Sequence, residues 1–466
     1  MRHTITTLLG MLLFGCALLS GQVQTGNITG TVRDASGAVV PSATVTALNL
    51  GTQARRTVQS GPAGAYTITG LQPGRYELTI TSGNFAPFKQ QIEVTVGGNA
   101  TADATLGVSA STTVEVIAQN AGVEVNTQTQ ELSQVISSQQ LSQLPSLTRN
   151  PYDFVMLSGN VSAGDRTGVG TVQAGQNSGQ SLTDRGVGYS INGQRSSGTE
   201  ILLDGVENGD LFATGAAQVI PQDAVQEYRI VTSNFDAQYG RASGGVVNLT
   251  TKAGTNAFHG SAWEFNRVSA LTARTYDNAA QNLESIRSGN GPLPKGTYTR
   301  NQFGYVITGP VIKNKLFFSQ ITEWVRVRSA ASLNALAPTP QLISFTAPNV
   351  QQFFQGAGKN LRPFGGTLSA AQVVAATGDT GAFATQVPGN TPAFGVVNYS
   401  APADAGGGNP QNTKDIIGRL DFNPTEATQM FFRYALYDES DFQGVVFNSP
   451  YTDFNVGQAN FANSAL

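Results

Sequence analysis

The stretch from residue 185 to residue 252 decides the fold. It begins RGVGYSINGQRSSGTEILLDGVENGD at Arg185 and ends PQDAVQEYRIVTSNFDAQYGRASGGVVNLTTK at Lys252. Short runs rich in aliphatic and β-branched residues alternate with glycine turns. Glycine permits chain reversal and close backbone approach, and β-branched residues favour strands. The stretch predicts a small mixed domain with tight turns, and nothing in it is catalytic.

Four motifs in this stretch resemble one family. They are NGQR at 192–195, LLDGVE at 202–207, IPQDAVQEYRI at 220–230 and YGRASGGVVNLTTKAGTN at 239–256. Their wording and order resemble the plug domain of TonB-dependent outer-membrane receptors, and most closely the Oar-like branch with its extra N-terminal domain. The resemblance implies a plug domain over residues 132–254. The positions that carry it are Asn192, Gly193, Asp204, Gly205, Tyr239, Gly240, Arg241, Gly244 and Gly245.

Composition agrees with an exported, mainly β protein. Only 12% of the 466 residues are charged, and 53 are glycine. This is too few charges for a typical cytosolic enzyme and too many apolar residues for a disordered chain. The formal net charge of −3 gives no basic surface, so nucleic-acid binding has no support.

Residues 1–21 are typical of a secretory signal peptide. Arg2 supplies the positive charge, and the apolar run from Leu8 to Leu19 is too short to span a bilayer. The residues before Cys16 faintly resemble a lipoprotein box, but the apolar run continues past Cys16, which disfavours lipidation. Cys16 is the only cysteine, so the mature chain forms no intramolecular disulfide.

Residues 22–108 predict a β-sandwich. Apolar residues recur at period two within short segments separated by glycine and proline turns. The predicted core positions are Ile28, Val45, Tyr66, Ile68, Tyr76, Leu78, Ile80, Ile92 and Val94. The pieces GTVRDASGAVVPSATV and GAYTITGLQPGRYELTI resemble the carboxypeptidase-regulatory-like fold, which is transthyretin-like and carbohydrate-binding-like and implies no peptidase activity. The region has no histidine or carboxylate cluster for a metal. We expect a rigid periplasmic spacer rather than a glycan-binding domain.

Residues 109–131 form a polar linker that contains one alternating run. An exposed extended strand can add to the edge of another protein's sheet. In the resembled family this position holds the TonB box, which implies TonB as a periplasmic partner. The candidate residues are Thr113, Val114, Glu115, Val116 and Ile117. The alternative interpretation is that this strand only closes the preceding sandwich.

Two short helices and a loop are expected at the start of the plug. The run Ser137-Ser138-Gln139-Gln140-Leu141 contains an N-cap candidate for a short helix that ends at Pro145, and Asn150 followed by Pro151 can begin another. Residues 159–186 are rich in Gly, Ser, Gln and Asp, which indicates a loop.

Residues 255–466 predict the first strands and loops of a transmembrane β-barrel. Five alternating segments are expected, at about 257–268, 301–310, 315–327, 414–422 and 428–437. The connections between them alternate long and short, as extracellular loops and periplasmic turns do. The longest, roughly 328–413, favours a functional or mobile loop, with a small extra domain or disorder as alternatives.

Five strands cannot close a barrel, because an open edge in lipid leaves backbone groups without partners. A plugged transporter barrel has about 22 strands. The chain also ends in Asn463-Ser464-Ala465-Leu466 without a terminal aromatic residue. We therefore expect an N-terminal fragment of a longer receptor.

Enzymatic interpretations have little support. Of the two histidines, His3 lies in the signal peptide and His259 begins a barrel strand. Asp204 and Glu207 suggest paired carboxylates, but a plug turn explains DGV better, and no phosphate-binding glycine loop is indicated. We expect no catalytic residues, no cofactor and no metal.

Two functions remain. The first is TonB-driven uptake of a bulky ligand across the outer membrane; siderophores, glycans and peptides are all open candidates. The second is a barrel-anchored adhesin or matrix-organising protein. The plug motifs together with the coupling strand favour transport.

Overall fold

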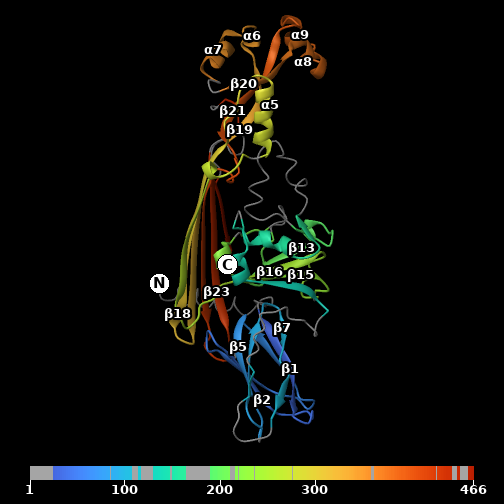
Figure 1. Cartoon of the computed structure of the whole chain (residues 1–466), viewed down its shortest axis with the longest axis vertical. Coiled ribbons are helices and arrows are strands. Elements are labelled where there is room, and N and C mark those ends of the chain that lie inside the picture. The colour runs from blue at the N-terminus through green and yellow to red at the C-terminus, as the bar shows by residue number, and fades with distance from the viewer. Residues whose placement is uncertain are drawn as a thin grey trace, which may run out of the picture.

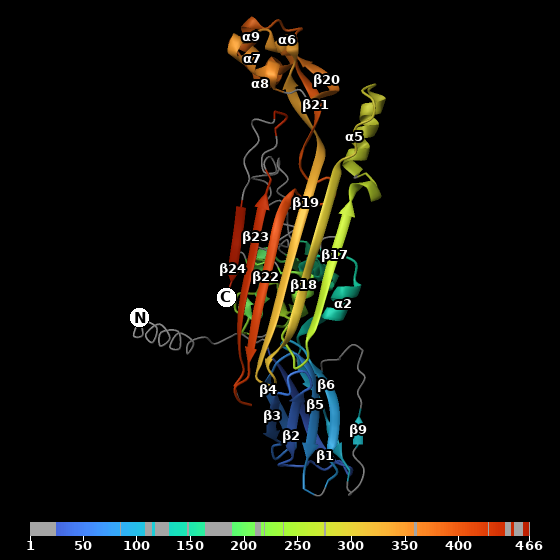
Figure 2. The ribbon, with the colours of Figure 1, turned by 90° about the vertical axis from the view of Figure 1, so that its left-hand side faces the viewer.

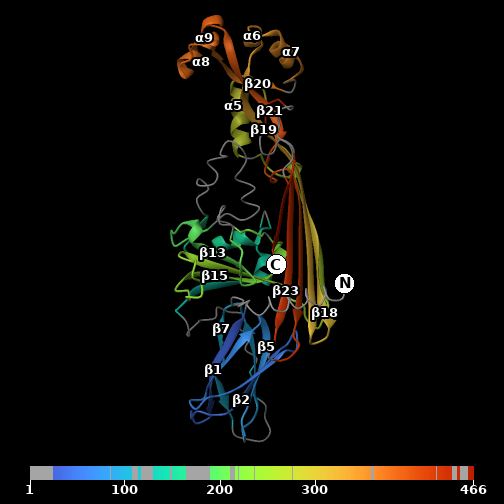
Figure 3. The same cartoon turned by 180° about the vertical axis from the view of Figure 1, so that it is seen from behind.

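The computed structural model describes residues 25–465 except 84, 108–113, 117–129, 147–148, 164–188, 210–215, 219, 236, 275, 358–360, 427, 443–448 and 452–459. The described chain is mainly β, as the sequence predicts. A small sandwich lies at one end, a plug lies beside a tall curved sheet, and a helical unit stands at the far end (Figures 1 and 3). The predicted signal peptide, residues 1–21, lies outside the described residues.

The N-terminal unit is a sandwich of two sheets. Its strands are β1 (Gly26–Asp34), β2 (Thr44–Asn49), β3 (Arg55–Gln59), β4 (Ala65–Leu71), β5 (Gly74–Thr81), β6 (Phe88–Val94), β7 (Asn99–Thr101) and β8 (Ala104–Leu106). One sheet has the order β4-β1-β7, with β8 also pairing β1, and the other begins β3-β2-β5-β6. Eight of the nine predicted core positions are buried, and Ile92 is half-buried against them. The predicted sandwich is confirmed.

A further strand lies at the edge of this sandwich. β9 (Val114–Val116) pairs in parallel with β6, with Val114 opposite Phe88 and Val116 opposite Gln90. Figure 2 shows β9 at the outer side of the second sheet. This is the placement that the alternative interpretation of the linker expected.

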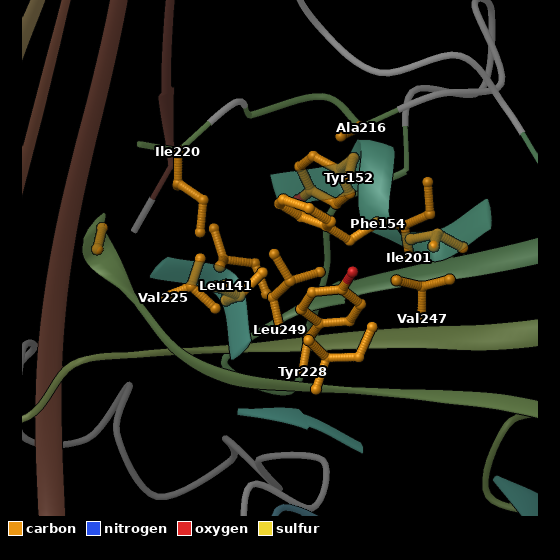
Figure 4. Close-up of a cluster of buried hydrophobic side chains, with 14 of the residues drawn as sticks. Leu141, Tyr152, Phe154, Ile201, Ala216, Ile220, Val225, Tyr228, Val247 and Leu249 are labelled. Atoms are coloured by element: carbon orange, nitrogen blue, oxygen red, sulfur yellow. The ribbon is translucent and has the colours of Figure 1, made fainter. Parts of the chain in front are cut away.

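The region predicted as a plug, which we call the plug, is built on a mixed five-stranded sheet. Its strands are β10 (Leu132–Ser137), β13 (Thr199–Leu203), β14 (Val206–Glu207), β15 (Val225–Ser233) and β16 (Gly245–Thr251), in the order β10-β15-β16-β13-β14. A separate pair, β11 (Val161–Ala163) and β12 (Tyr189–Ile191), lies beside it. Aromatic and aliphatic side chains from all these parts form one core, in which Tyr152 and Tyr228 lie among Leu141, Val247 and Leu249 (Figure 4).

The two predicted helix starts are present. α2 (Ser138–Gln143) begins with a capping box in which Ser137 and Gln140 bond each other's backbone. Asn150 caps the next segment through the backbone N–H of Tyr152, and Pro151 is its first residue. That segment, η2 (Pro151–Leu157), is a 3-10 helix. The predicted loop at 159–186 lies largely outside the described residues.

Six strands form the wall beside the plug, in the order β17-β18-β19-β22-β23-β24 (Figure 2). They are β17 (His259–Val268), β18 (Thr297–Ile312), β19 (Leu316–Pro338), β22 (Gln411–Phe422), β23 (Met430–Asp441) and β24 (Asn460–Ala465). All five predicted segments are confirmed. The sixth strand was missed, because NFANSA lacks the clear apolar alternation of the others.

The wall has an apolar outer face and an inner face that packs on the plug. In β23, Met430, Phe432 and Tyr434 are exposed, whereas Arg433 and Ala435 are buried; Phe431, near the start of the strand, is exposed as well. This is the alternation that a membrane strand requires. Val306, Ile321, Ile417 and Ala435, from four neighbouring strands, join the core of the plug. No helix in the described part of the chain is long and apolar enough to cross a membrane.

The long connection between β19 and β22 is folded. The expectation that it is mobile is corrected, and it forms a small extra domain, as the alternative interpretation proposed, whereas its functional role stays a prediction. We call this unit the headpiece. The outer end of β19 pairs with β21 (Pro392–Pro402), which pairs with β20 (Arg362–Ser369). The helices α6 (Pro340–Ile343), α7 (Pro348–Gly356), α8 (Ala370–Thr377) and α9 (Ala382–Gln386) complete it. Its core includes Leu342, Ala370, Val387 and Ala393. α5 (Tyr276–Arg287), from the β17–β18 connection, stands beside it (Figure 2).

Candidate functional site

The candidate site begins at the turn between β13 and β14. Leu203 pairs with Val206, so Asp204 and Gly205 form a two-residue hairpin loop. Both have positive φ, 49° and 75°, as the Asp-Gly sequence of such loops favours. Asp204 is held further by its N–H, which donates to the carbonyl of Leu249 at 2.7 Å. The DGV motif is therefore a turn, as predicted, and it fixes the direction of the Asp204 side chain.

The carboxylate of Asp204 is bound first within the plug. The backbone N–H of Thr251 donates to Oδ1 at 2.8 Å, and the Thr251 hydroxyl donates to Oδ2 at 2.7 Å. Thr251 is the last residue of β16, the strand that runs parallel to β13. The motif that ends NLTTK thus supplies a cradle for the carboxylate of the LLDGVE motif.

Two arginines of the wall complete the coordination of Asp204. Arg419 on β22 donates through Nη1 to Oδ1 at 3.1 Å, and Arg433 on β23 donates through Nη1 to Oδ2 at 2.8 Å. Arg419 also bonds the hydroxyl of Thr251 at 3.1 Å. The Asp204 side chain is fully buried, and both arginine side chains are almost so. We call Asp204, Thr251, Arg419, Arg433 and Asp421 the lock.

The lock is balanced in charge. Asp421, two residues from Arg419 on the same face of β22, binds Arg419 through Nε and Nη2, the latter at 2.8 Å. Two guanidinium groups and two carboxylates therefore sum to zero. Buried charges are tolerated when they are paired and hydrogen-bonded. The plug is thus held to the wall by a polar contact whose removal on one side alone leaves charge uncompensated.

The plug meets the wall at a second polar place. The guanidinium of Arg149, which pairs with Asp223, lies 3.8 Å from the ring centre of Phe265 on β17. A small cavity between plug and wall lies next to it, lined by Arg149 and Pro221 on the plug and by Arg300, Glu323, Asp415 and Tyr437 on the wall. The interface between plug and wall therefore contains charged groups and a small cavity beside the apolar core that the two parts share.

The other plug-motif residues have structural places away from the lock. Asn192 and Gly193 form a second loop with positive φ, and the Asn192 amide bonds the carbonyl of Thr232. A Cβ on Gly245 would lie 2.6 Å from the carbonyl oxygen of Val231 and 2.7 Å from Ile191 Cδ1, so only glycine fits there. A Cβ on Gly244 would lie 3.1 Å from Cβ of Gln194, a tight but less severe contact.

The YGR part of the motif lies on the sheet end next to the sandwich. Tyr239 is buried with Leu202, Val231 and Val246. Arg241 makes an exposed ion pair of 3.4 Å with Glu207, and Gly240 faces open space. Of the nine motif positions, Asp204 is the one that forms part of the lock.

The structure describes three of the five residues of the TonB-box candidate. Val114, Glu115 and Val116 are β9, at the edge of the sandwich. Thr113 and Ile117 lie outside the described residues. The assignment of a TonB box to this strand stays a prediction.

Sequence reasoning missed Arg419, Arg433 and Asp421. Their signal is a charged residue on the buried face of a strand whose other face is apolar, in GRLDF and FFRYALY. Such residues point away from lipid, toward the lumen or the plug. Among the described residues, no group of three or more His, Cys, Asp or Glu side chains is placed to hold a metal ion.

Comparisons with known proteins agree with this architecture. Residues 250–466 match an outer membrane beta barrel domain, and residues 27–107 match a carboxypeptidase regulatory-like domain. The TonB-dependent transporter Oar of Myxococcus xanthus is 26% identical over 353 residues, which cover 72% of this chain and 30% of that protein. Over this region the chain is similar to Oar. It spans about 30% of the length of this curated relative.

Solved structures with similarity to this chain include two receptors. The siderophore receptor PirA from Acinetobacter baumannii is 18% identical, with a TM-score of 0.36, over 66% of this chain and 32% of PirA. The ferric enterobactin receptor PfeA is 16% identical, with a TM-score of 0.34, over 66% of this chain and 33% of PfeA.

Proposed function

We propose that this chain is the coupling, gating and initial barrel portion of a TonB-dependent transporter that takes up a bulky ligand through the outer membrane. The observation that carries the proposal is the lock: Asp204 fastens the plug to the inner face of the membrane-type wall through buried ion pairs, beside the apolar core that plug and wall share. A polar fastening suits a part that must leave and return, because its groups regain water or other partners when it opens.

The coupling strand is the second support. β9 pairs with β6 over three residues and lies at the edge of its sheet, so little is lost when it leaves. A short edge strand is a suitable ligand for strand addition to another protein's sheet. TonB, acting from the periplasm, is the partner that this chemistry and the homology to Oar favour. Catalysis has no part in the proposal, and the names of the relatives are those of a transporter and receptors.

The test is site-specific photo-crosslinking to TonB in cells. A crosslinker at Glu115 is expected to capture TonB. The matched control is Thr57 on β3, the opposite edge strand of the same sheet, which is expected not to capture it. Equal capture at both sites, or none at Glu115 in protein that reaches the outer membrane, contradicts the proposal.

The folded headpiece supports a second candidate function, that of an adhesin. A small folded domain held beyond the wall fits an adhesin as well as a receptor. If TonB is not captured and deletion of residues 340–392 abolishes cell–cell adhesion, the adhesin function is favoured instead.

A further inference from the structure

We propose that the N-terminal sandwich is a clasp, which holds the plug and the wall together at their shared periplasmic end. Two turns of the sandwich make the contacts: the β6–β7 turn, residues 95–98, and the β2–β3 turn, residues 50–54. The sandwich lies below both plug and wall in two opposite views (Figures 1 and 3). This goes beyond the proposed function, and its test needs neither TonB nor a ligand.

The plug binds the first turn through both backbone polar groups of Val96, the N–H and the carbonyl. The N–H of Val96 donates to Oε1 of Glu227 at 2.5 Å, and Nη1 of Arg229 donates to the Val96 carbonyl at 3.2 Å. Glu227 and Arg229 are two residues apart on β15 and so lie on one face of the strand. Val96, Glu227 and Arg229 are all buried.

Arg229 is itself held in place by further hydrogen bonds. Nη2 of Arg229 donates to Glu131 at 2.7 Å and to the hydroxyl of Ser133 at 2.9 Å. Glu131 lies where the linker from the sandwich enters the plug. The guanidinium therefore ties together the sandwich turn, the end of the linker and the first strand of the plug.

The shape of the turn fits this surface closely. Gly97 has a φ of 61°, and a Cβ there would lie 3.6 Å from Nη1 of Arg229 and 3.8 Å from the hydroxyl of Tyr239. The tip of the turn thus faces a side chain of the YGR motif. A Cβ at Gly97 would make ordinary contact with both groups, and a longer side chain would be added directly against them.

The second turn reaches the junction between plug and wall. The N–H of Asn256 donates to the carbonyl of Gly51 at 2.9 Å. Asn256 lies on the segment that leaves the plug for β17. Its side chain makes two bonds to Asn314, in the turn between β18 and β19, at 2.7 and 2.8 Å. The sandwich is therefore joined through one residue to the connecting segment and to the wall.

These contacts make the sandwich a bridge rather than a spacer. One turn is bound to the plug sheet, and the other is bound at the base of the wall. The bonds named here are polar, so they can break and re-form. A displacement of the plug relative to the wall must therefore break at least one of the two attachments.

The first experiment uses a disulfide across the second attachment. A Cβ on Gly51 would lie 3.7 Å from Cβ of Thr255, within the range of about 3.5–4.5 Å that disulfides require. Gly51→Cys with Thr255→Cys, in the full chain with Cys16 replaced by Ser, is expected to crosslink nearly completely under mild oxidation, as mass spectrometry of the digest reports. The control pair is Gly365→Cys with Val396→Cys in the headpiece, with a Cβ separation of 3.4 Å, at the lower limit of that range.

The second experiment weakens the first attachment by mutation and measures the effect on the crosslinking rate at the second attachment. Gly97→Asn keeps a residue that tolerates positive φ but adds a side chain against Arg229. It is expected to slow crosslinking of the 51/255 pair severalfold and to leave the headpiece pair unchanged. The matched control is Gly37→Asn, in the same domain, where φ is 87° and nothing lies within 4 Å of the added Cβ.

If Gly97→Asn fails to fold, a second variant still tests the clasp. Glu227→Ala removes the same grip from the side of the plug and must slow the 51/255 crosslink as well. The clasp is refuted if the 51/255 pair fails to crosslink while the headpiece pair does. It is refuted equally if Gly97→Asn and Glu227→Ala both leave the rate at that of Gly37→Asn.

Discussion

Arg419 and Arg433 are direct register partners on β22 and β23, and both guanidinium groups bind the one carboxylate of Asp204. Like charges opposite each other on adjacent strands repel when nothing lies between them. Here a side chain from another domain supplies the compensating charge. The wall is therefore electrostatically complete only when the plug is in place.

Asp204→Asn tests this dependence. The change leaves two buried guanidinium groups facing an amide, and breaking a buried pair from one side costs about 3–5 kcal/mol. We expect a large fall in the melting temperature of the detergent-solubilised chain and faster proteolysis of the plug. The control is Glu207→Gln on the same hairpin, whose pair with Arg241 is exposed and contributes less than about 1 kcal/mol. Equal effects of the two changes would show that the lock contributes little.

Gly205→Ala tests the turn that aims Asp204. A non-glycine residue at a φ of 75° costs about 1–3 kcal/mol. We expect destabilisation in that range by thermal melting, together with a weaker hold of the plug. Gly240→Ala serves as the control, because open space surrounds that position and its destabilisation is expected to be small. A neutral Gly205→Ala would mean that the hairpin adapts without strain.

Docking of the sandwich is expected to weaken as pH rises. Burial raises the pKa of Glu227 to about 7, and Glu93 on β6 raises it further, while the Val96 N–H and Arg229 lower it. A docked pKa above the ordinary value of 4.5 means that docking takes up a proton. The contribution is full below pH 4.5 and is lost as pH rises through about 7. If docking causes the whole shift, docking is up to about tenfold weaker at pH 8 than at pH 6.

The measurement is the crosslinking rate of the 51/255 pair at the two pH values, divided by the rate of the headpiece pair. This ratio cancels the pH dependence of thiol chemistry itself. Glu227→Gln cannot ionise, so its ratio is expected to stay flat. A wild-type ratio that is equally flat would show that Glu227 keeps one protonation state in both forms.

Val114→Pro separates the two interpretations of β9. Proline fixes φ and removes a backbone donor, so strand addition to TonB is weakened. We expect most of the TonB crosslink at Glu115 to disappear while the amount of protein at the cell surface is unchanged. If β9 only closes the sandwich, the outcome reverses: the sandwich melts at a lower temperature and TonB capture is unaffected.

Much of the fold was predictable because its signals are local. Period-two apolar residues predicted the sandwich core, and the Asp204–Gly205 and Asn192–Gly193 pairs predicted turns from the backbone conformations that they favour. The capping residues Ser137 and Asn150 act within three residues of their own position.

The lock and the clasp were not predictable, because each depends on contacts between distant parts of the chain. Asp204 and Arg433 are 229 residues apart, and Val96 and Glu227 are 131 apart. A single sequence shows that Asp204 ends a strand and that Arg433 interrupts an apolar one. It does not show that the two side chains are in contact in the folded protein. The headpiece was only an alternative expectation for a related reason, since its core is assembled from short helices that alternate with two strands.

The length of β19 has a consequence for where this molecule meets the outside. Its 23 residues extend roughly 75 Å, whereas a tilted strand needs only about 9–11 residues to cross the hydrocarbon layer. About a dozen residues therefore rise past the lipid, and the headpiece is carried on that stalk. An arriving molecule would encounter the headpiece well above the membrane surface, before it reached the outer end of the wall.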